Sequence, residues 1–85
     1  MNFDHAESAV LATVHVAMPQ GFALPALNHK GLPDFEVTPA EARKACNRLR
    51  LRGFVAKVGP YAQLTALGME LFADLEETIS GGRHA

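Results

Sequence analysis

The sequence TPAEARKACNRLRLRGF, residues 38–54, carries signals for both ends of one helix. Thr38 offers a hydroxyl for the N-cap, a proline follows at the first helical position, and Glu41 completes a capping box. Gly53 stands where a left-handed residue commonly ends a helix. The pattern therefore predicts a helix over residues 39–52.

This predicted helix separates into two faces at 100° per residue. Small and aliphatic side chains share the face that we expect to pack on the core: Ala42, Ala45, Cys46 and Leu49. The opposite face is polar and basic, and we call it the cationic ridge: Arg43, Lys44, Asn47 and Arg48, with Arg50 and Arg52 at its flanks. The helix is predicted to pack with one face and to present cations on the other.

The net charge of −1 conceals a strong asymmetry along the chain. Residues 42–69 contain six basic side chains and no acid, whereas the rest of the sequence holds two basic residues and all nine acids. An exposed helix that is stabilised by its own ion pairs usually places Glu four residues from Lys or Arg. No acid lies among residues 42–69, so we expect the ridge cations to lack acidic partners. Such a block is typical of a polyanion-binding surface. An acidic protein partner and an ordinary solvated helix face are the alternatives.

Length and composition indicate one domain over residues 1–85. The chain is 48% hydrophobic, but its apolar runs fall short of the ~18 residues needed to span a bilayer, so no membrane association is expected. Acids precede the most apolar stretch where a secretory signal needs positive charge, which favours a cytoplasmic protein that begins at Met1.

Signals for chemistry are missing from the sequence. One cysteine forms no intramolecular disulfide, and the four histidines have no metal-ligand spacing. No nucleophile stands beside a base, and no glycine-rich loop could cradle a phosphate. We expect no metal, no cofactor and no enzymatic activity.

Pro19 separates two predicted segments that precede the cationic ridge. Asp4 and Glu7 form a capping pair, and the apolar run that follows predicts a helix over residues 5–18. A helix that is apolar on most sides belongs in a core or in a homodimer interface. Residues 19–37 hold three prolines and two glycines and are predicted to be irregular, with a strand at 22–24 and a helical turn at 26–30.

The chain after the ridge predicts a hairpin and a last helix. Two strand-like runs flank Gly59-Pro60 and indicate a hairpin over residues 54–65. Thr65 caps a helix predicted over residues 66–79. Its outer face carries four acids and should avoid nucleic acid: Glu70, Asp74, Glu76 and Glu77.

Two motifs in this order resemble the winged helix-turn-helix domain of prokaryotic regulators of the MarR and PadR types. They are C-x-x-L-x-x-x-G-F-V at residues 46–55 and L-T-x-x-G-x-x-L at residues 64–71. The resemblance covers residues 38–75. It implies an α+β winged helix of three to four helices with a small antiparallel hairpin as the wing. It also implies a homodimeric regulator of transcription, prokaryotic or phage in style, that binds double-stranded DNA.

The sequence departs from the family pattern in two places. Family members have a clear second helix where this chain has the proline-rich residues 19–37. The hairpin is short and Lys57 is its only cation, so little minor-groove contact is expected.

Under the DNA hypothesis the ridge residues divide by position. Four side chains would face base edges in the major groove, where Arg pairs with guanine and Asn with adenine: Arg43, Lys44, Asn47 and Arg48. Three would hold phosphates: Arg50, Arg52 and Lys57. The alternative is a winged-helix interaction module, an adaptor or inhibitor that docks on an acidic protein surface.

Overall fold

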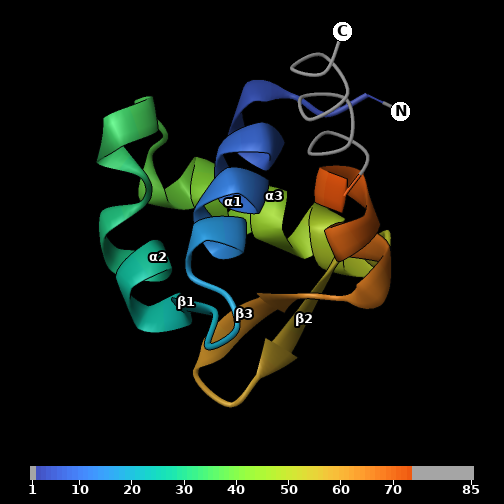
Figure 1. Ribbon diagram of the computed structural model, residues 1–85. Helices are drawn as coiled ribbons and strands as arrows, with labels where there is room; N and C mark the ends of the chain where they lie inside the picture. The colour runs from blue at the N-terminus through green and yellow to red at the C-terminus, as the bar shows by residue number, and fades with distance from the viewer. Residues whose placement is uncertain (1, 74–85) are drawn as a thin grey trace, which may run out of the picture.

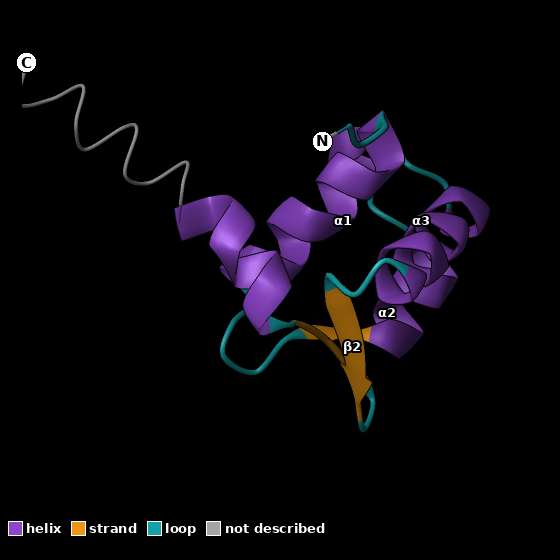
Figure 2. Ribbon diagram, turned by 90° about the vertical axis from the view of Figure 1, so that its right-hand side faces the viewer, coloured by secondary structure: helices purple, strands orange, loops and turns teal. Residues whose placement is uncertain are grey.

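A computed structural model describes residues 2–73 as an α+β domain (Figure 1). The elements in chain order are α1 (His5–Val16), β1 (Phe22–Ala23), α2 (Leu24–Lys30), the 3-10 helix η1 (Pro33–Phe35), α3 (Pro39–Leu51), β2 (Val55–Val58), β3 (Tyr61–Leu64) and a helix at residues 66–73. The three strands form one antiparallel sheet in the order β1-β3-β2. Figure 2 shows the helices gathered above this sheet.

The capping signals of α3 work as the sequence predicts. The Thr38 hydroxyl accepts a hydrogen bond from the Glu41 amide at 3.2 Å, and the Glu41 carboxylate accepts one from the Thr38 amide at 3.0 Å. The helix ends at Leu51, and Gly53 adopts φ +87°, the left-handed region that glycine enters at little cost. The predicted helix is confirmed to within one residue at its end.

The first helix is shorter than predicted. Asp4 and Glu7 form the expected capping box, but α1 ends at Val16 and residues 17–20 form a turn. The residue before a proline is disfavoured in helical conformation, so the chain leaves the helix ahead of Pro19 rather than next to it.

The short elements predicted within residues 19–37 are present with slightly different bounds: the strand covers Phe22–Ala23 rather than 22–24, and the helical turn predicted at 26–30 is α2, Leu24–Lys30. Phe22 pairs with Ala62 in the sheet, and α2 runs for seven residues and buries Leu27 in the core. The prolines and glycines fall at element boundaries rather than inside them. Pro25 lies in the first turn of α2, where its missing N–H costs nothing, and Gly31 caps the helix at φ +65°.

The hairpin and the last helix follow the sequence pattern. Val58 pairs with Tyr61 across a two-residue connection, which confirms the predicted hairpin. The Thr65 hydroxyl accepts a hydrogen bond from the Gly68 amide at 3.1 Å and caps the helix at residues 66–73. Glu70 is exposed there, and the other predicted acids, Asp74, Glu76 and Glu77, lie outside the described residues.

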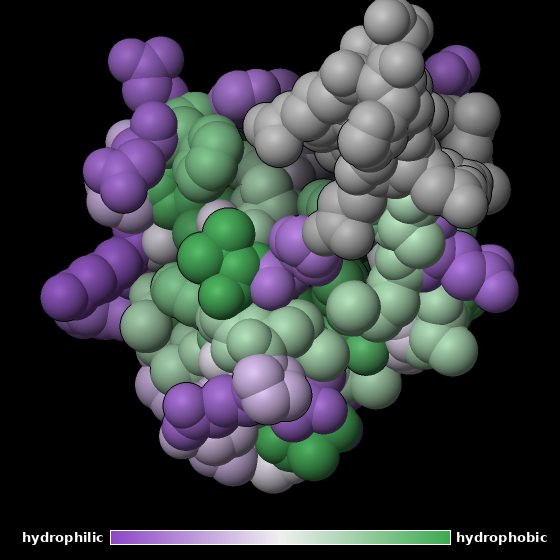
Figure 3. Space-filling model, viewed as in Figure 1, coloured by the Kyte–Doolittle hydropathy of each residue, from purple (hydrophilic) through white to green (hydrophobic). Residues whose placement is uncertain are grey.

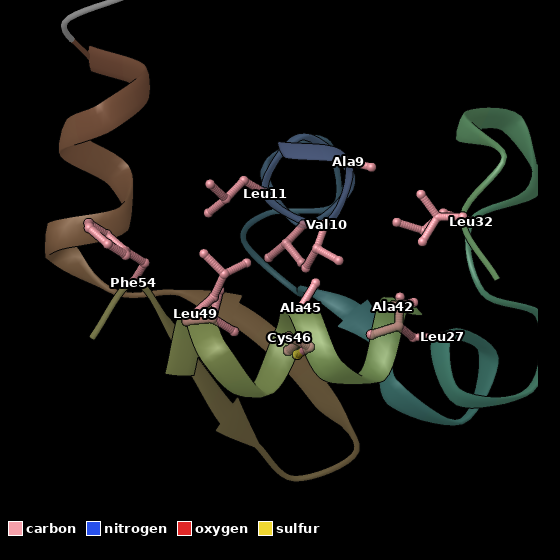
Figure 4. Packing of buried hydrophobic residues seen from close by; sticks show 14 of the residues in the cluster. Ala9, Val10, Leu11, Leu27, Leu32, Ala42, Ala45, Cys46, Leu49 and Phe54 are labelled. Carbon is pink, nitrogen blue, oxygen red and sulfur yellow. The ribbon is translucent and has the colours of Figure 1, made fainter. Parts of the chain in front are cut away.

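The core is centred on the contact between α1 and α3. All four residues of the predicted apolar stripe of α3 are buried: Ala42, Ala45, Cys46 and Leu49. Figure 4 shows Val10 of α1 and Ala45 of α3 pointing toward each other, so a small side chain lets the two helices approach closely. Packing through this stripe leaves the cationic ridge on the outer side of α3.

Candidate nucleic-acid interface

Every residue of the predicted site is exposed, but the site is not one surface. The exposed set is Arg43, Lys44, Asn47, Arg48, Arg50, Arg52 and Lys57. The cations of α3 separate into two edges with different surroundings. We call Arg48 and Arg52, which face α1, the paired edge, and Arg43, Asn47 and Arg50, on the opposite border of the ridge, the open edge.

The paired edge is neutralised by two acids of the α1 N-terminus. The Arg48 guanidinium donates to the Asp4 carboxylate at 2.8 Å and lies 3.6 Å from a Glu7 carboxylate oxygen. Arg52 donates to the same Glu7 oxygen at 3.2 Å. The prediction that the ridge cations lack acidic partners is therefore wrong for this edge. The partners lie 44 and 45 positions away in the sequence, beyond the reach of any i,i+4 rule.

Glu7 is the one buried charged residue in the part of the chain that the structure describes, at 5% exposure. One of its oxygens accepts from the Asp4 amide at 3.0 Å, and the other accepts from Arg52. Within residues 2–73 no buried side-chain nitrogen or oxygen lacks a hydrogen-bond partner. The sequence assigned Glu7 only a capping role, whereas the fold gives it a second role as the anchor of two arginines.

Arg52 is also held by aromatic rings. Its guanidinium carbon lies 4.6 Å from the centre of the Phe3 ring and 5.3 Å from the centre of the Phe54 ring. The two rings contact each other edge to face at 5.4 Å. Cation–π contacts of this kind contribute about 0.5–1 kcal/mol at exposed sites. Arg52 therefore fastens the segment before α1 to the end of α3.

The open edge differs from the paired edge in its surroundings. Among residues 2–73, no carboxylate forms an ion pair with Arg43, Arg50 or Lys57. A surface hollow of about 580 Å³ lies beside α3 and β2. Residues of the open edge and of the hairpin line it: Asn47, Arg50, Leu51, Val55, Ala56 and Lys57. Cations from two elements thus flank one concave surface.

Leu51 lies at the centre of the outer side of α3 and is 89% exposed. It follows Asn47 by one helical turn and lines the hollow beside Arg50. Leu51 was not among the predicted site residues, because the ridge was defined by polar and basic side chains. The i,i+4 spacing from Asn47 could have identified it as part of the same surface.

Lys44 lies between the two edges. It lines a second hollow of about 360 Å³ together with Asp4, His5, Ala6, Glu41 and Arg48. The hydrogen bonds from the backbone and the hydroxyl of Thr38 lower the pKa of the Glu41 carboxyl, so this acid is ionised at neutral pH. Lys44 thus lines the same hollow as Asp4 and Glu41, but it forms no ion pair with another residue of the described chain.

Cys46 lies on the packed side of α3. Burial raises the pKa of its thiol, which keeps it in the unreactive protonated form. No group of three or more histidine, cysteine or acidic side chains is placed to hold a metal ion in the described part of the chain. Of the helices described there, none combines the length and the hydropathy that crossing a membrane requires.

Comparison with protein-family models, with curated proteins and with solved structures found no match for this chain.

Proposed function

We propose that this protein is a sequence-specific DNA-binding regulator of transcription with a winged helix-turn-helix fold. The order of its elements supports the proposal. A helix is followed by a short strand, two helices, a hairpin and a further helix, and the short strand and the hairpin form one three-stranded sheet. The segment between α1 and α3 contains α2, which would be the first helix of the helix-turn-helix pair, with α3 as the second, recognition helix.

The observation that carries the proposal is the open edge. It projects outward from a helix whose opposite side is buried, and the part of the chain described here leaves its cations without carboxylate partners. In a major groove, Arg43 would pair with guanine and Asn47 with adenine. Arg50 and Lys57, which line one hollow, would hold the sugar–phosphate backbone beside that groove.

The paired edge reduces the number of cations available for DNA. With Arg48 and Arg52 engaged by Glu7, four basic side chains remain on this side: Arg43, Lys44, Arg50 and Lys57. Each phosphate contact contributes about −0.9 to the slope of log K against log salt on duplex DNA. We therefore expect a slope of about −3 to −4 per protomer.

The test begins with selection of bound duplexes from a random DNA pool, followed by a salt titration on the enriched sequence. Enrichment of one sequence and a slope in this range support the proposal. Lys30→Ala is the matched control, because it removes an exposed cation from α2 and should leave the slope unchanged. Failure to enrich any sequence, with no duplex binding at about 50 mM salt, would contradict the proposal.

Leu51 favours a second candidate function, an adaptor or inhibitor that docks on an acidic protein surface. An almost fully exposed leucine beside Arg50 and Lys57 could seat an apolar side chain flanked by acids. In that case Leu51→Asp abolishes capture of the acidic partner, and duplex DNA does not bind at low salt.

A further inference from the structure

Strand β2 lies at the edge of the sheet, with β3 on one side and no strand of the described chain on the other. The Thr65 amide donates to the Phe54 carbonyl at 3.1 Å, and hydrogen-bonded pairs recur at every second residue along an antiparallel ladder. Ala56 and Val58 therefore direct their backbone groups toward β3, whereas Lys57 between them directs its N–H and C=O outward. Such an edge is a template for a further strand.

The hollow beside α3 follows this edge. Three consecutive residues of β2 line it, Val55, Ala56 and Lys57. Because successive side chains of a strand point to opposite faces of the sheet, a hollow that touches all three runs along the edge rather than over one face. Arg50 and Leu51 of α3 belong to its other wall. The outward edge of β2 thus borders a hollow of about 580 Å³, in which side chains of an added strand have room.

The chemistry of this surface indicates what kind of strand would fit. Arg50 and Lys57 flank the hollow, and neither forms an ion pair with a carboxylate of residues 2–73. Leu51 is 89% exposed on the wall formed by α3, and Val58 is 48% exposed next to the hairpin turn. Figure 3 shows hydrophobic and hydrophilic surface side by side at the lower end of the domain, where the hairpin turns in Figure 1. A complementary strand therefore carries both acidic and apolar side chains.

We propose that the outer edge of β2 binds an extended acidic peptide of a partner protein, which adds to the sheet as a fourth strand. Its backbone pairs with the N–H and C=O of Lys57, its acidic side chains lie at Arg50 and Lys57, and an apolar side chain packs on Leu51. A peptide fits this edge better than a nucleic acid does, because phosphate oxygens only accept hydrogen bonds and leave the Lys57 carbonyl without a donor. This mode of binding, which rests on the second candidate function, specifies how the acidic partner is held and keeps the DNA backbone out of the same hollow.

The probe is a library of random peptides of about ten residues, the length of a long strand, selected on the full chain. The enriched sequences should combine acidic with aliphatic residues, and fluorescence anisotropy measures their affinity. Lys57→Pro is compared with Lys57→Ala, because both remove the ammonium group and only proline removes the outward N–H, a change that an edge strand accommodates. Lys57→Ala should weaken binding by about 5-fold. Lys57→Pro should weaken it by about a further 10-fold, since it leaves a peptide carbonyl unpaired. Circular dichroism checks that both variants are folded.

A second measurement leaves the protein unchanged and decides the question even if Lys57→Pro does not fold. Each backbone amide of the enriched peptide is N-methylated in turn. Losses of about 10-fold should recur at every second amide, because alternate amides of an added strand face β2.

The outcomes separate strand addition from DNA binding. Failure to enrich acidic peptides overturns strand addition, as do equal affinities for the two folded Lys57 variants or losses on N-methylation without a period of two. If a duplex is selected but no acidic peptide is, strand addition fails and the DNA proposal stands. If the peptide binds as expected and no duplex DNA binds at about 50 mM salt, strand addition holds and the DNA proposal fails.

Discussion

The two edges of α3 carry the same kind of side chain and differ in what surrounds them. On the paired edge, Arg48 and Arg52 meet the carboxylates of α1, and on the open edge Arg43 and Arg50 meet none in the described chain. The first pair of arginines is thereby engaged by carboxylates of the fold, and the second pair, within residues 2–73, is not. A run of like charge in a sequence therefore does not by itself define a free surface.

The difference also has an energetic side. The ion pair between Arg48 and Asp4 is half exposed at both ends, and pairs of this kind contribute about 0–1 kcal/mol. Glu7 is buried, so loss of its partners would leave a carboxylate without the guanidinium groups that compensate for its desolvation. The paired edge is consequently a structural feature even though its arginines touch solvent.

The largest expected effect is on the open edge. Arg43→Ala combined with Arg50→Ala should lower the affinity for the selected duplex by about 100-fold or more, because two charge-assisted contacts are lost at about 1.5–3 kcal/mol each. The free energy of unfolding should change by less than about 0.5 kcal/mol, since neither side chain is buried. Fluorescence anisotropy and urea unfolding measure the two quantities. Retained affinity would show that the open edge is not the DNA contact.

The matched change on the paired edge should have the reverse effect. Arg48→Ala combined with Arg52→Ala leaves Glu7 without its ion-pair partners and should cost about 2–3 kcal/mol of stability, with a fall in Tm of roughly 10–20 °C. At a temperature where the variant is folded, its DNA affinity should fall by less than about 10-fold. A stable variant with abolished binding would reverse the roles of the two edges.

Glu7→Gln sharpens the same comparison. Glutamine can still accept the hydrogen bond from the Asp4 amide but carries no charge, so the change isolates the ion pairs from the cap. Stability should fall by about 1–2 kcal/mol. Arg52, whose ion pair among the described residues is with Glu7 alone, should also become available to phosphate, so the salt slope should become steeper by about 1. An unchanged slope together with lower stability would mean that the released arginine does not reach the DNA.

A smaller effect is expected at the centre of the ridge. Leu51→Ala shortens an apolar side chain that is 89% exposed, so stability should stay constant within about 0.5 kcal/mol. Affinity for the duplex should fall by up to about 10-fold if the leucine contacts a thymine methyl group. Replacement of each thymine in the site by deoxyuridine checks this contact, because the wild type should lose affinity at one position where Leu51→Ala does not.

The smallest effect concerns the cap of α3. The pKa of Glu41 is lowered from its ordinary value of 4.5 by hydrogen bonds from Thr38, so its contribution is fully present above about pH 4.5 and is lost as the pH falls through the lower folded pKa. The stability difference between the wild type and Glu41→Gln should therefore be constant from pH 7 to about pH 5 and shrink below that. Urea unfolding at several pH values measures it, and a difference that persists at pH 3 would contradict the assignment.

Local signals predicted much of this fold. The capping boxes at Asp4 and Thr38, the glycine after α3 and the two-residue hairpin connection depend on residues within a few positions of one another, and the structure contains each of them. Over residues 19–37 the short strand and the helical turn were also predicted, and α2 begins two residues before the predicted turn. Pro25 and Gly31 lie at the two ends of this helix, where proline and glycine are compatible with helix limits.

For the candidate site, too, local sequence signals predicted one part and long-range contacts decided the other. The sequence by itself determined which residues of α3 are buried and which are exposed, because helical periodicity assigns each residue a direction once the caps set the limits of the helix. Only the tertiary structure decided which exposed cations are paired, because the carboxylates that neutralise Arg48 and Arg52 come from the N-terminus of α1, more than forty residues earlier. The distance between charges in space sets their interaction, and the crossing of α1 over α3 sets that distance.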